Sequence, residues 1–408
     1  MNILFIHANY PAQFHWLAAD LGAQGQHDVR FLTARKDAPS EPIAGVGVEL
    51  FSDPAGQVAS AGVLHLATDE SISRGSVIEA KLVELAAGGF VPRLAVVHGG
   101  NGLALLIKQL IPGCAVVGYF EWYFSSNSAP LLLGQSDRLS RNQVHLRNLV
   151  IGHELLCCDA AVVPTAWQAS QFPPALQPKL QVIFDGVDPR LCHPPTDPCR
   201  RWPLRLEGES GAVEVAADQP LLTYATRGME PLRGFPEFMR ALPAVLAARP
   251  ELQVVIAGRD RSAYGAPAPS HGGSWKQMLM EELASFAGWE RVSFTGLLTR
   301  AAYAQMLQRT HLHVYFSRPY VTSWSLFEAV ACGAPILSNP GNTTTGTLPP
   351  EQFAEVVELE AGPEAISEAM LAGLRGTRNG VPAPPWLWRA QAQQAWQQLV
   401  NAALAQTA

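Results

Sequence analysis

Two arginines in the stretch "TYATRGMEPLRGF" have the type and spacing to bind a phosphate. Arg227 and Arg233 are six residues apart, in a loop that follows an apolar run and precedes a helical pattern beginning near Pro236. A guanidinium presents a planar fork of N–H donors to phosphate oxygens, and a helix N-terminus adds a favourable potential for an anion. The pair therefore predicts a clamp for a diphosphate. The alternative is a solvated loop in which one arginine pairs with Glu230.

The stretch "PYVTSWSLFEAVACGAP" combines hydroxyls, an indole and a single carboxylate. We expect a strand to end at about Ser317 and a helix to begin near Ser323 or Ser325, with Glu328 in about its first turn. The two carboxylate oxygens can accept both hydroxyls of a vicinal diol, and the first N–H groups of a helix can bind a phosphate or a sugar. A carboxylate favoured only by the helix dipole would account for Glu328, but not for the residues before it. Those candidate residues are Thr322, Ser323, Trp324 and Ser325.

Two further candidates end predicted strands in the first half of the chain. His98 follows an apolar run in "VVHGGNG", where glycines allow the backbone to approach a ligand closely. Glu121 lies among aromatic residues in "VVGYFEWYF", where a carboxylate is costly to bury unless it is paired or protonated. A structural histidine and an ion pair at the sheet edge are the alternatives. We favour a functional role for Glu121 and leave both interpretations of His98 open.

Two weaker signals also follow predicted strands. "VSFTGLL" ends in Gly296, whose backbone could bind the edge of a nucleobase while Leu297 and Leu298 pack on its face. "HANYPAQF" leads into a helix and could offer N–H groups to an anion near Ala12 and Gln13. It lacks the G-x-G-x-x-G pattern, which argues against a dinucleotide oxidoreductase. Each of these loops is equally compatible with an ordinary turn.

These candidates are positioned by apolar strands that alternate with helical patterns, which predicts an α/β protein with parallel sheets covered on both faces. The alternation pauses between about Cys192 and Gln219, in a polar segment rich in Pro, Gly and acidic residues, and then restarts. We predict an N-terminal domain at 1–195, a second domain at 196–380 and a terminal helix at 381–408. Ligands bind beyond the carboxyl ends of parallel strands. Two facing sheets would therefore form a cleft lined by the candidate residues.

Composition narrows the class of protein. The chain has 408 residues and a net charge of −6, with no basic half, so nothing indicates nucleic-acid binding. We find no signal peptide and no apolar run long enough to span a membrane, which predicts a cytoplasmic protein. Peripheral contact with the inner face of a membrane stays open. The six cysteines show no C-x-x-C spacing and are predicted to be free thiols: Cys114, Cys157, Cys158, Cys192, Cys199 and Cys332.

Over nearly its whole length the chain resembles the retaining glycosyltransferases of family 4, which have the GT-B architecture of two facing Rossmann-like domains. The resemblance is carried by Arg227…Arg233-Gly234, "VVIAG", "VSFTG" and "SLFEAVACGAPIL", and in the first half by "MNILFIHANYPAQF", "AVVPT" and "VIFDGVD". Asp185 stands where the family's Asn-Gly-Val-Asp segment has Asn. The helix after Trp386 and Trp388 resembles the family's last helix, which crosses back to the first domain.

The resemblance implies roles for several residues. Arg227 and Arg233 match the Arg/Lys pair that binds the donor diphosphate, and Glu328 matches the second Glu of a paired-glutamate motif, which binds the ribose. Tyr320 stands where relatives have the first Glu, a residue that commonly contacts the transferred sugar. Residues 321–325 replace the usual Gly-Phe-Gly-Leu-Pro. Glu121 falls where relatives often have His.

The implied reaction is transfer of a sugar from a nucleotide donor to a hydroxyl acceptor, such as a saccharide or a lipid-linked glycan, with the anomeric configuration retained. UDP-sugars are the favoured donors and GDP-mannose the next. The arginines and the helix start would stabilise the leaving diphosphate without a metal. No D-x-D follows a predicted strand, so neither a metal nor a cofactor is expected. Closure of the two domains would exclude water.

Other functions on this architecture stay open. A phosphorylase would need a lysine that carries pyridoxal phosphate, and none stands out in the sequence. A sugar-nucleotide epimerase should have more acid and base groups in the cleft. A non-catalytic sugar-nucleotide-binding protein is compatible with the loss of a glutamate at Tyr320. Oligomeric state leaves no signal in the sequence.

Overall fold

The computed structural model of the chain describes residues 1–197, 202–376 and 381–407. The chain divides into two compact units. The first unit consists of Met1–Ala129, Ser136–Asp185 and Ala390–Ala408, and the second of Pro130–Gln135 and Gly186–Arg389. The final segment of the chain thus belongs with its beginning.

The first unit is built on a seven-stranded parallel sheet in the order β3-β2-β1-β4-β5-β6-β7. The order reverses direction between β1 and β4, so the loops after these two strands diverge and leave a binding position between them. The strands are β1 Asn2–His7, β2 Asp28–Thr33, β3 Val46–Leu50, β4 Leu94–His98, β5 Ala115–Tyr119, β6 Ala160–Val163 and β7 Leu180–Val182.

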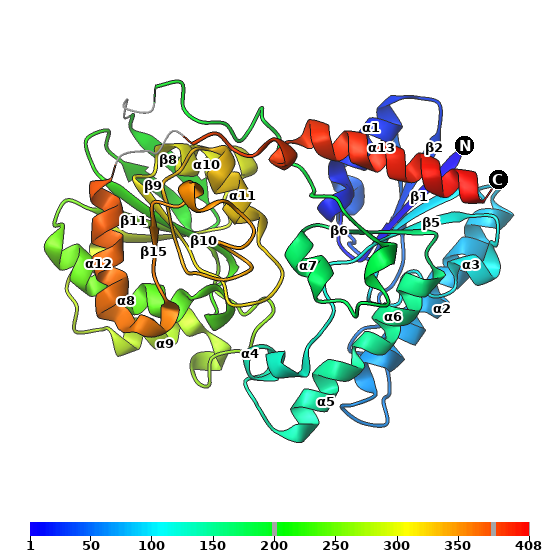
Figure 1. Cartoon of the computed structure of the whole chain (residues 1–408), viewed down its shortest axis with the longest axis horizontal. Coiled ribbons are helices and arrows are strands. Elements are labelled where there is room, and N and C mark those ends of the chain that lie inside the picture. Colours follow the sequence, from blue (N-terminus) through cyan, green and yellow to red (C-terminus); the bar gives the residue numbers. More distant parts are fainter. Residues whose placement is uncertain (198–201, 377–380, 408) are drawn as a thin grey trace. The chain divides into compact units, whose positions relative to one another are not determined.

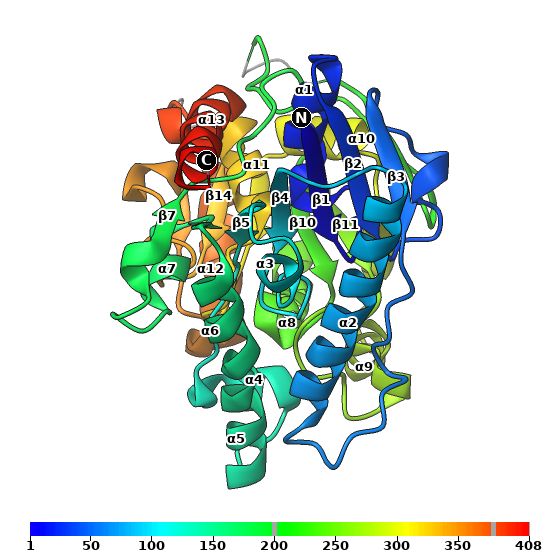
Figure 2. The ribbon, with the colours of Figure 1, turned by 90° about the vertical axis from the view of Figure 1, so that its right-hand side faces the viewer.

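Helices cover both faces of this sheet. In Figure 1, α1 and α13 lie above the sheet and α2 and α6 below it, and Figure 2 shows α2, α3 and α6 on the same side. The helices are α1 His15–Ala23, α2 Leu66–Ala87, α3 Ile107–Leu110, α5 Arg138–Leu146, α6 Asn148–Cys157, α7 Ala166–Ser170 and α13 Arg389–Gln406. Between α3 and α5, α4 Ala129–Leu133 lies mainly in the segment assigned to the second unit.

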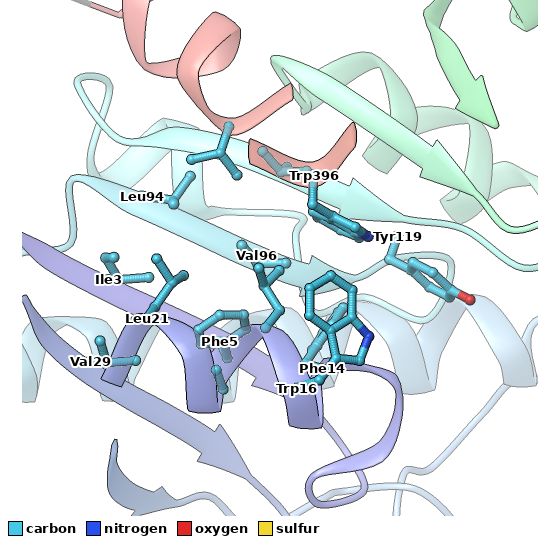
Figure 3. Close-up of a cluster of buried hydrophobic side chains, with 14 of the residues drawn as sticks. Ile3, Phe5, Phe14, Trp16, Leu21, Val29, Leu94, Val96, Tyr119 and Trp396 are labelled. Carbon is cyan, nitrogen blue, oxygen red and sulfur yellow. The ribbon is translucent and has the colours of Figure 1, made fainter. Parts of the chain in front are cut away.

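Alternation along the central strand explains how both faces are filled. Ile3 and Phe5 pack on one face with residues of α1 and α13, while Leu4 and Ile6 pack on the other with residues of α2 and α6. Trp396, which is 2% exposed, inserts into the first of these layers. Figure 3 shows Trp396 of α13 and Trp16 of α1 in the same apolar cluster as Phe5. The terminal helix is therefore part of the core of the first unit, as the sequence predicted.

The second unit repeats the topology with a six-stranded parallel sheet in the order β12-β11-β10-β13-β14-β15. Its reversal point lies between β10 and β13. The strands are β10 Leu221–Gly228, β11 Gln253–Arg259, β12 Val292–Gly296, β13 Leu312–Tyr315, β14 Ile336–Ser338 and β15 Glu355–Val356, and the helices are α8 Phe235–Ala248, α9 Trp275–Glu282, α10 Arg300–Arg309, α11 Trp324–Ala331 and α12 Gly362–Arg375.

Two parts of the sequence prediction need correction. The polar segment taken as a domain boundary contains an antiparallel hairpin, β8 Leu204–Gly208 and β9 Gly211–Val215, in which Leu204 and Leu206 are buried between exposed residues. The stretch "GLALLIKQLIPG" has the apolar spacing that predicts a longer helix, but only Ile107–Leu110 is α-helical. Cys199 lies outside the described residues, and the other five cysteines are free thiols. Within the described part of the chain, no helix has the length and apolarity to cross a bilayer.

Candidate active site

Arg233 is a buried and anchored cation at the reversal point of the second unit. It is only 7% exposed, and its guanidinium donates from Nη1 to Ser317 Oγ at 2.7 Å and from Nη2 to the Val321 carbonyl at 2.9 Å. Gly234 follows in the left-handed region (φ 63°), where a Cβ would lie 2.5 Å from Phe316. The two loops at the reversal point, after β10 and after β13, are thus joined by one guanidinium, which lies beneath the start of α11.

The start of α11 leaves polar groups available. Ser323 is the N-cap, and its hydroxyl accepts from Ser325 N–H at 3.4 Å. Thr322 is 5% exposed, and its Oγ1 has no hydrogen-bond partner among the described residues. A buried hydroxyl without a partner is costly, unless a ligand supplies the missing hydrogen bond. Trp324, the first helical residue, is 39% exposed.

Glu328 lies in the second turn of α11, because the helix begins at Trp324 and its first turn has no acidic residue. This corrects the sequence prediction by about one turn. The carboxyl is partly exposed and forms no hydrogen bond within the described residues. Burial raises its pKa to about 7, while the positive charge of Arg300 acts in the opposite direction. The group is therefore poised between the neutral and ionised forms near neutral pH.

Arg227 is exposed and does not form the ion pair with Glu230 that was the alternative interpretation of this loop. Its Nη1 donates to the Tyr264 hydroxyl at 2.8 Å, and its guanidinium carbon lies 5.5 Å from the centre of that ring. Tyr264 also contacts Tyr320, with 5.5 Å between the ring centres. Glu230 is instead fully buried and binds backbone N–H groups. Tyr320, where the resembling family has a glutamate, is thus part of an aromatic pair.

The loop after β12 is hydrogen-bonded to the β8–β9 hairpin. Leu297 N–H donates to Glu209 Oε2 at 3.1 Å, and its carbonyl accepts from Glu209 N–H at 3.2 Å. Leu298 pairs with Gly208 in an isolated antiparallel bridge, and the Leu297 side chain is 40% exposed. The backbone of this loop is therefore already paired with residues 208–209. Binding of the base by Gly296, Leu297 and Leu298 stays a prediction, and it depends mainly on the two leucine side chains.

In the first unit, four side chains form a continuous chain of hydrogen bonds at the ends of β1, β4 and β5. Asn9 N–H donates to His7 Nδ1 at 2.8 Å, which leaves Nε2 of the neutral ring to donate to Gln13 Oε1 at 3.0 Å. Gln13 Nε2 donates to Glu121 Oε1 at 2.9 Å, and Glu121 Oε2 lies 3.3 Å from His98 Nε2. The sequence prediction named Gln13, Glu121 and His98, and the structure brings these three together.

His7 is the member of this chain that the sequence prediction missed. Its ring is 5% exposed and its centre lies 4.3 Å from that of His98. Its position directly before "ANYPAQF", at a strand end, was the available signal. Ala12, also predicted, contributes no side-chain bond but has a positive φ of 47°, which is uncommon for a residue with a Cβ. The loop that carries Gln13 is thus held in a conformation that few sequences adopt.

A buried carboxylate holds the neighbouring glycine loop. Glu154 of α6 is completely buried and accepts from the N–H groups of Gly100 and Ala104. Burial raises the pKa of this carboxyl, and the backbone donors oppose that rise. His98, which opens the loop, has its Nδ1 buried without a hydrogen-bond partner in the described part of the chain. The orientation of His98 is thus set by Glu121 on one side and by the tethered loop on the other.

Comparisons with known proteins agree with this arrangement. Residues 25–191 match the glycosyl transferase family 4 group and residues 219–375 match glycosyl transferases group 1, so the two matches together span most of the chain. No curated protein matches the chain by sequence. Within the described residues, no group of three or more His, Cys, Asp and Glu side chains could hold a metal ion.

Solved structures similar to the chain share its fold. Sucrose-phosphate synthase from Thermosynechococcus elongatus is 15% identical, with 100% of this chain and 97% of the other aligned at a TM-score of 0.61. Anabaena HepE in complex with UDP-glucose is 14% identical, with 100% and 98% aligned at 0.59. The catalytic domain of starch synthase IV from Arabidopsis thaliana, bound to ADP and acarbose, is 12% identical, with 99% of each chain aligned at 0.62. The chain belongs to the glycosyltransferases of family 4, group 1, which transfer a sugar from a nucleotide-sugar, and has their GT-B architecture.

Proposed function

We propose that this glycosyltransferase transfers a hexosyl group from a UDP-sugar, with GDP-mannose as the second choice of donor, to a hydroxyl acceptor, and that it retains the anomeric configuration. The observation that carries the proposal is the anchored guanidinium of Arg233 next to the unpartnered hydroxyl of Thr322 at the start of α11. Together they offer a fixed positive charge and a hydroxyl at the reversal point of the sheet, where ligands of such folds bind.

The arrangement supports a division of roles. Arg233 and the exposed Arg227 bind the diphosphate and stabilise the negative charge that grows on it as the bond to the sugar breaks. The first N–H groups of α11 add to this potential. Glu328, in its ionised form, accepts the ribose hydroxyls. A phosphate oxygen of the donor, on the face that the leaving group departs from, takes the proton of the acceptor hydroxyl, so no general base from the protein is required.

The first unit supplies the acceptor side in this proposal. The chain of His7, Gln13, Glu121 and His98 holds a carboxylate and an imidazole at the strand ends, where both can bind hydroxyls of the acceptor. HepE was solved in complex with UDP-glucose, which favours a UDP-sugar as donor. The site as proposed does not use a metal, and the proposed location is the cytoplasm, with peripheral contact to the inner face of the membrane left open.

The test is a donor panel in which the protein is incubated with UDP-, GDP-, ADP- and dTDP-sugars and hydroxyl acceptors. We expect release of nucleoside diphosphate that depends on the acceptor and is unaffected by a chelator, and a product with the donor's anomeric configuration by NMR. Arg233→Ala should reduce kcat/KM by about a hundredfold or more, within the range found for loss of one electrostatic group. An inverted product, or turnover that is unchanged in both Arg227→Ala and Arg233→Ala, would overturn the proposal.

A further inference from the structure

A buried carboxylate in the second unit organises a loop that carries no recognisable sequence motif. Glu230 is 0% exposed, and in the sequence it lies midway between Arg227 and Arg233. Its Oε2 accepts from three successive N–H groups of the loop between β11 and α9, at 2.8 Å from Ala263, 3.1 Å from Tyr264 and 2.9 Å from Gly265. Its Oε1 is buried without a hydrogen-bond partner in the residues described. Among the residues that the structure describes, no cation forms a salt bridge with it, so the carboxylate serves the loop.

A second set of bonds fixes the same loop one residue further on. Ala266 N–H donates to the Leu131 carbonyl at 3.3 Å, and the Ala266 carbonyl accepts from Trp275 Nε1 at 3.0 Å and from Ser262 Oγ at 3.2 Å. A loop held at four successive residues therefore has little freedom to change the direction in which Tyr264 points.

Tyr264 connects this loop to the candidate donor site. Its hydroxyl accepts from Arg227 at 2.8 Å, and its ring contacts Tyr320. It is 38% exposed, so part of the ring and hydroxyl can still meet a ligand. A free arginine side chain loses conformational entropy when a ligand orders it. A phenol that already holds the guanidinium removes part of that loss before the donor binds.

We propose that Tyr264 is a donor-binding residue of this enzyme and that Glu230 positions it. The proposal rests on the proposed function, in which Arg227 binds the donor diphosphate. Tyr264 orients Arg227 toward the phosphate and presents aromatic surface to the transferred sugar, while the buried Tyr320 supports its ring. Sugars offer faces of C–H groups that pack on aromatic rings, and the phenolic oxygens can bind their hydroxyls. The sugar subsite is thus lined by the Tyr264 ring, which packs on Tyr320 at the position where the resembling family has a glutamate.

The test separates the hydroxyl from the ring. Tyr264→Phe keeps the ring but removes the acceptor for Arg227, so we expect a donor KM and a nucleoside diphosphate Kd that both rise by about tenfold, which corresponds to about 1.4 kcal/mol. Tyr264→Ala also removes the aromatic surface. It should therefore weaken the binding of the nucleotide-sugar more than the binding of the nucleoside diphosphate. Because Tyr264 is partly exposed, neither variant should lower Tm by more than a few degrees.

Glu230 is tested by rescue. Glu230→Gln keeps one oxygen that can accept the three N–H groups, whereas Glu230→Ala leaves them unpaired. Glu230→Ala should reproduce the binding losses of Tyr264→Ala and speed amide exchange at residues 263–265, and Glu230→Gln should restore most of both. Glu251→Gln, on the surface next to Arg249, is the matched control and should behave as the wild type.

The outcomes distinguish this proposal from the one on which it rests. If Arg233→Ala abolishes nucleotide binding while both Tyr264 variants bind and turn over donor as the wild type does, the role of Tyr264 is wrong and the proposed function stands. If Glu230→Ala speeds loop exchange but leaves donor KM unchanged, Glu230 is only structural and its positioning role is wrong. If the wild type neither binds nor turns over any nucleotide-sugar, both proposals fall.

Discussion

At the scale of single residues, the raised pKa of Glu328 predicts how the stability of the protein depends on pH. Its pKa in the folded protein is raised to about 7, above its ordinary value of 4.5, because burial disfavours the charged form. Between these two values the folded state binds more protons than the unfolded state, so the free energy of unfolding falls as pH rises through this window. Without nucleotide, Glu328→Gln should therefore raise Tm at pH 8 and leave it nearly unchanged at pH 5.

Glu282→Gln is the matched control for this measurement. The Arg240 guanidinium lowers the pKa of the Glu282 carboxyl, so the ionised form of Glu282 stabilises the fold. Its contribution to the free energy of unfolding therefore rises with pH, opposite to that of Glu328. This variant should slightly lower Tm at pH 8. An equal rise in Tm for Glu328→Gln at both pH values would show that the raised pKa of Glu328 is wrong.

A second prediction is that a lysine at position 233 cannot replace the arginine. The guanidinium reaches Ser317 and Val321 with two different nitrogens, and a single ammonium cannot span both at the same geometry. Arg233→Lys should keep the charge but lower kcat/KM by about tenfold, with part of the loss in kcat because the charge is less well placed. Arg240→Lys, in an exposed ion pair, should have no effect on kcat/KM. Equal activity in the two variants would contradict the anchoring role.

The same residues show what the sequence can and cannot predict. Arg233 and Glu328 were identifiable because their types and local spacing match a chemical task. The partners of Arg233 were not, because Ser317 is 84 residues away and becomes a neighbour only when β10 and β13 pair. Tyr264 was missed for a similar reason. Its loop has no charge or spacing pattern, and its place next to Arg227 depends on a tether to Glu230.

At the scale of elements, the tether between α6 and the loop after β4 is the most testable feature. Glu154→Ala would leave the N–H groups of Gly100 and Ala104 buried without acceptors, at a cost of about 1–3 kcal/mol for each group. We expect a lower Tm, faster amide exchange at residues 99–104, and reduced turnover because His98 loses its support. Asp159 lies nearby in an ion pair with Lys108, and Asp159→Ala is the control. Unchanged exchange at 99–104 in Glu154→Ala would contradict the role of the tether.

Elements with strong periodicity were the ones that the sequence predicted. The buried strands β1, β4 and β10 are short apolar runs that end in polar residues. The edge strand β3 was not predicted, because its run VGVEL is short, includes a glycine and a glutamate, and has no fully buried residue. The hairpin β8–β9 has the alternation of a strand, but its setting among Pro, Gly and acidic residues obscured it. Local composition is a weak guide where an element is half exposed.

At the scale of the whole molecule, the two sheets and the return of the last helix to the first unit followed from the alternation of strands and helices and from the family resemblance. The sequence did not indicate that Pro130–Gln135, deep in the first half of the chain, belongs to the second compact unit. In the loop that carries Tyr264, the Ala266 N–H donates to the Leu131 carbonyl of this segment, and the two residues are 135 positions apart. Such a contact leaves no local pattern.

The return of α13 makes the stability of the first unit depend on the last residues of the chain. Trp396 is 2% exposed and packs in one cluster with Phe5 and Trp16, and Gln393 binds the Asp20 carboxylate. Replacing a buried tryptophan by alanine costs about 3–5 kcal/mol. In calorimetry, Trp396→Ala should lower the unfolding temperature of the first unit, and amide exchange should rise in β1 and α1 rather than in β10. Trp386→Ala, at a position 40% exposed in the second unit, should cost much less. If the two variants were equally stable, α13 would be an appendage of the first unit instead of part of its core.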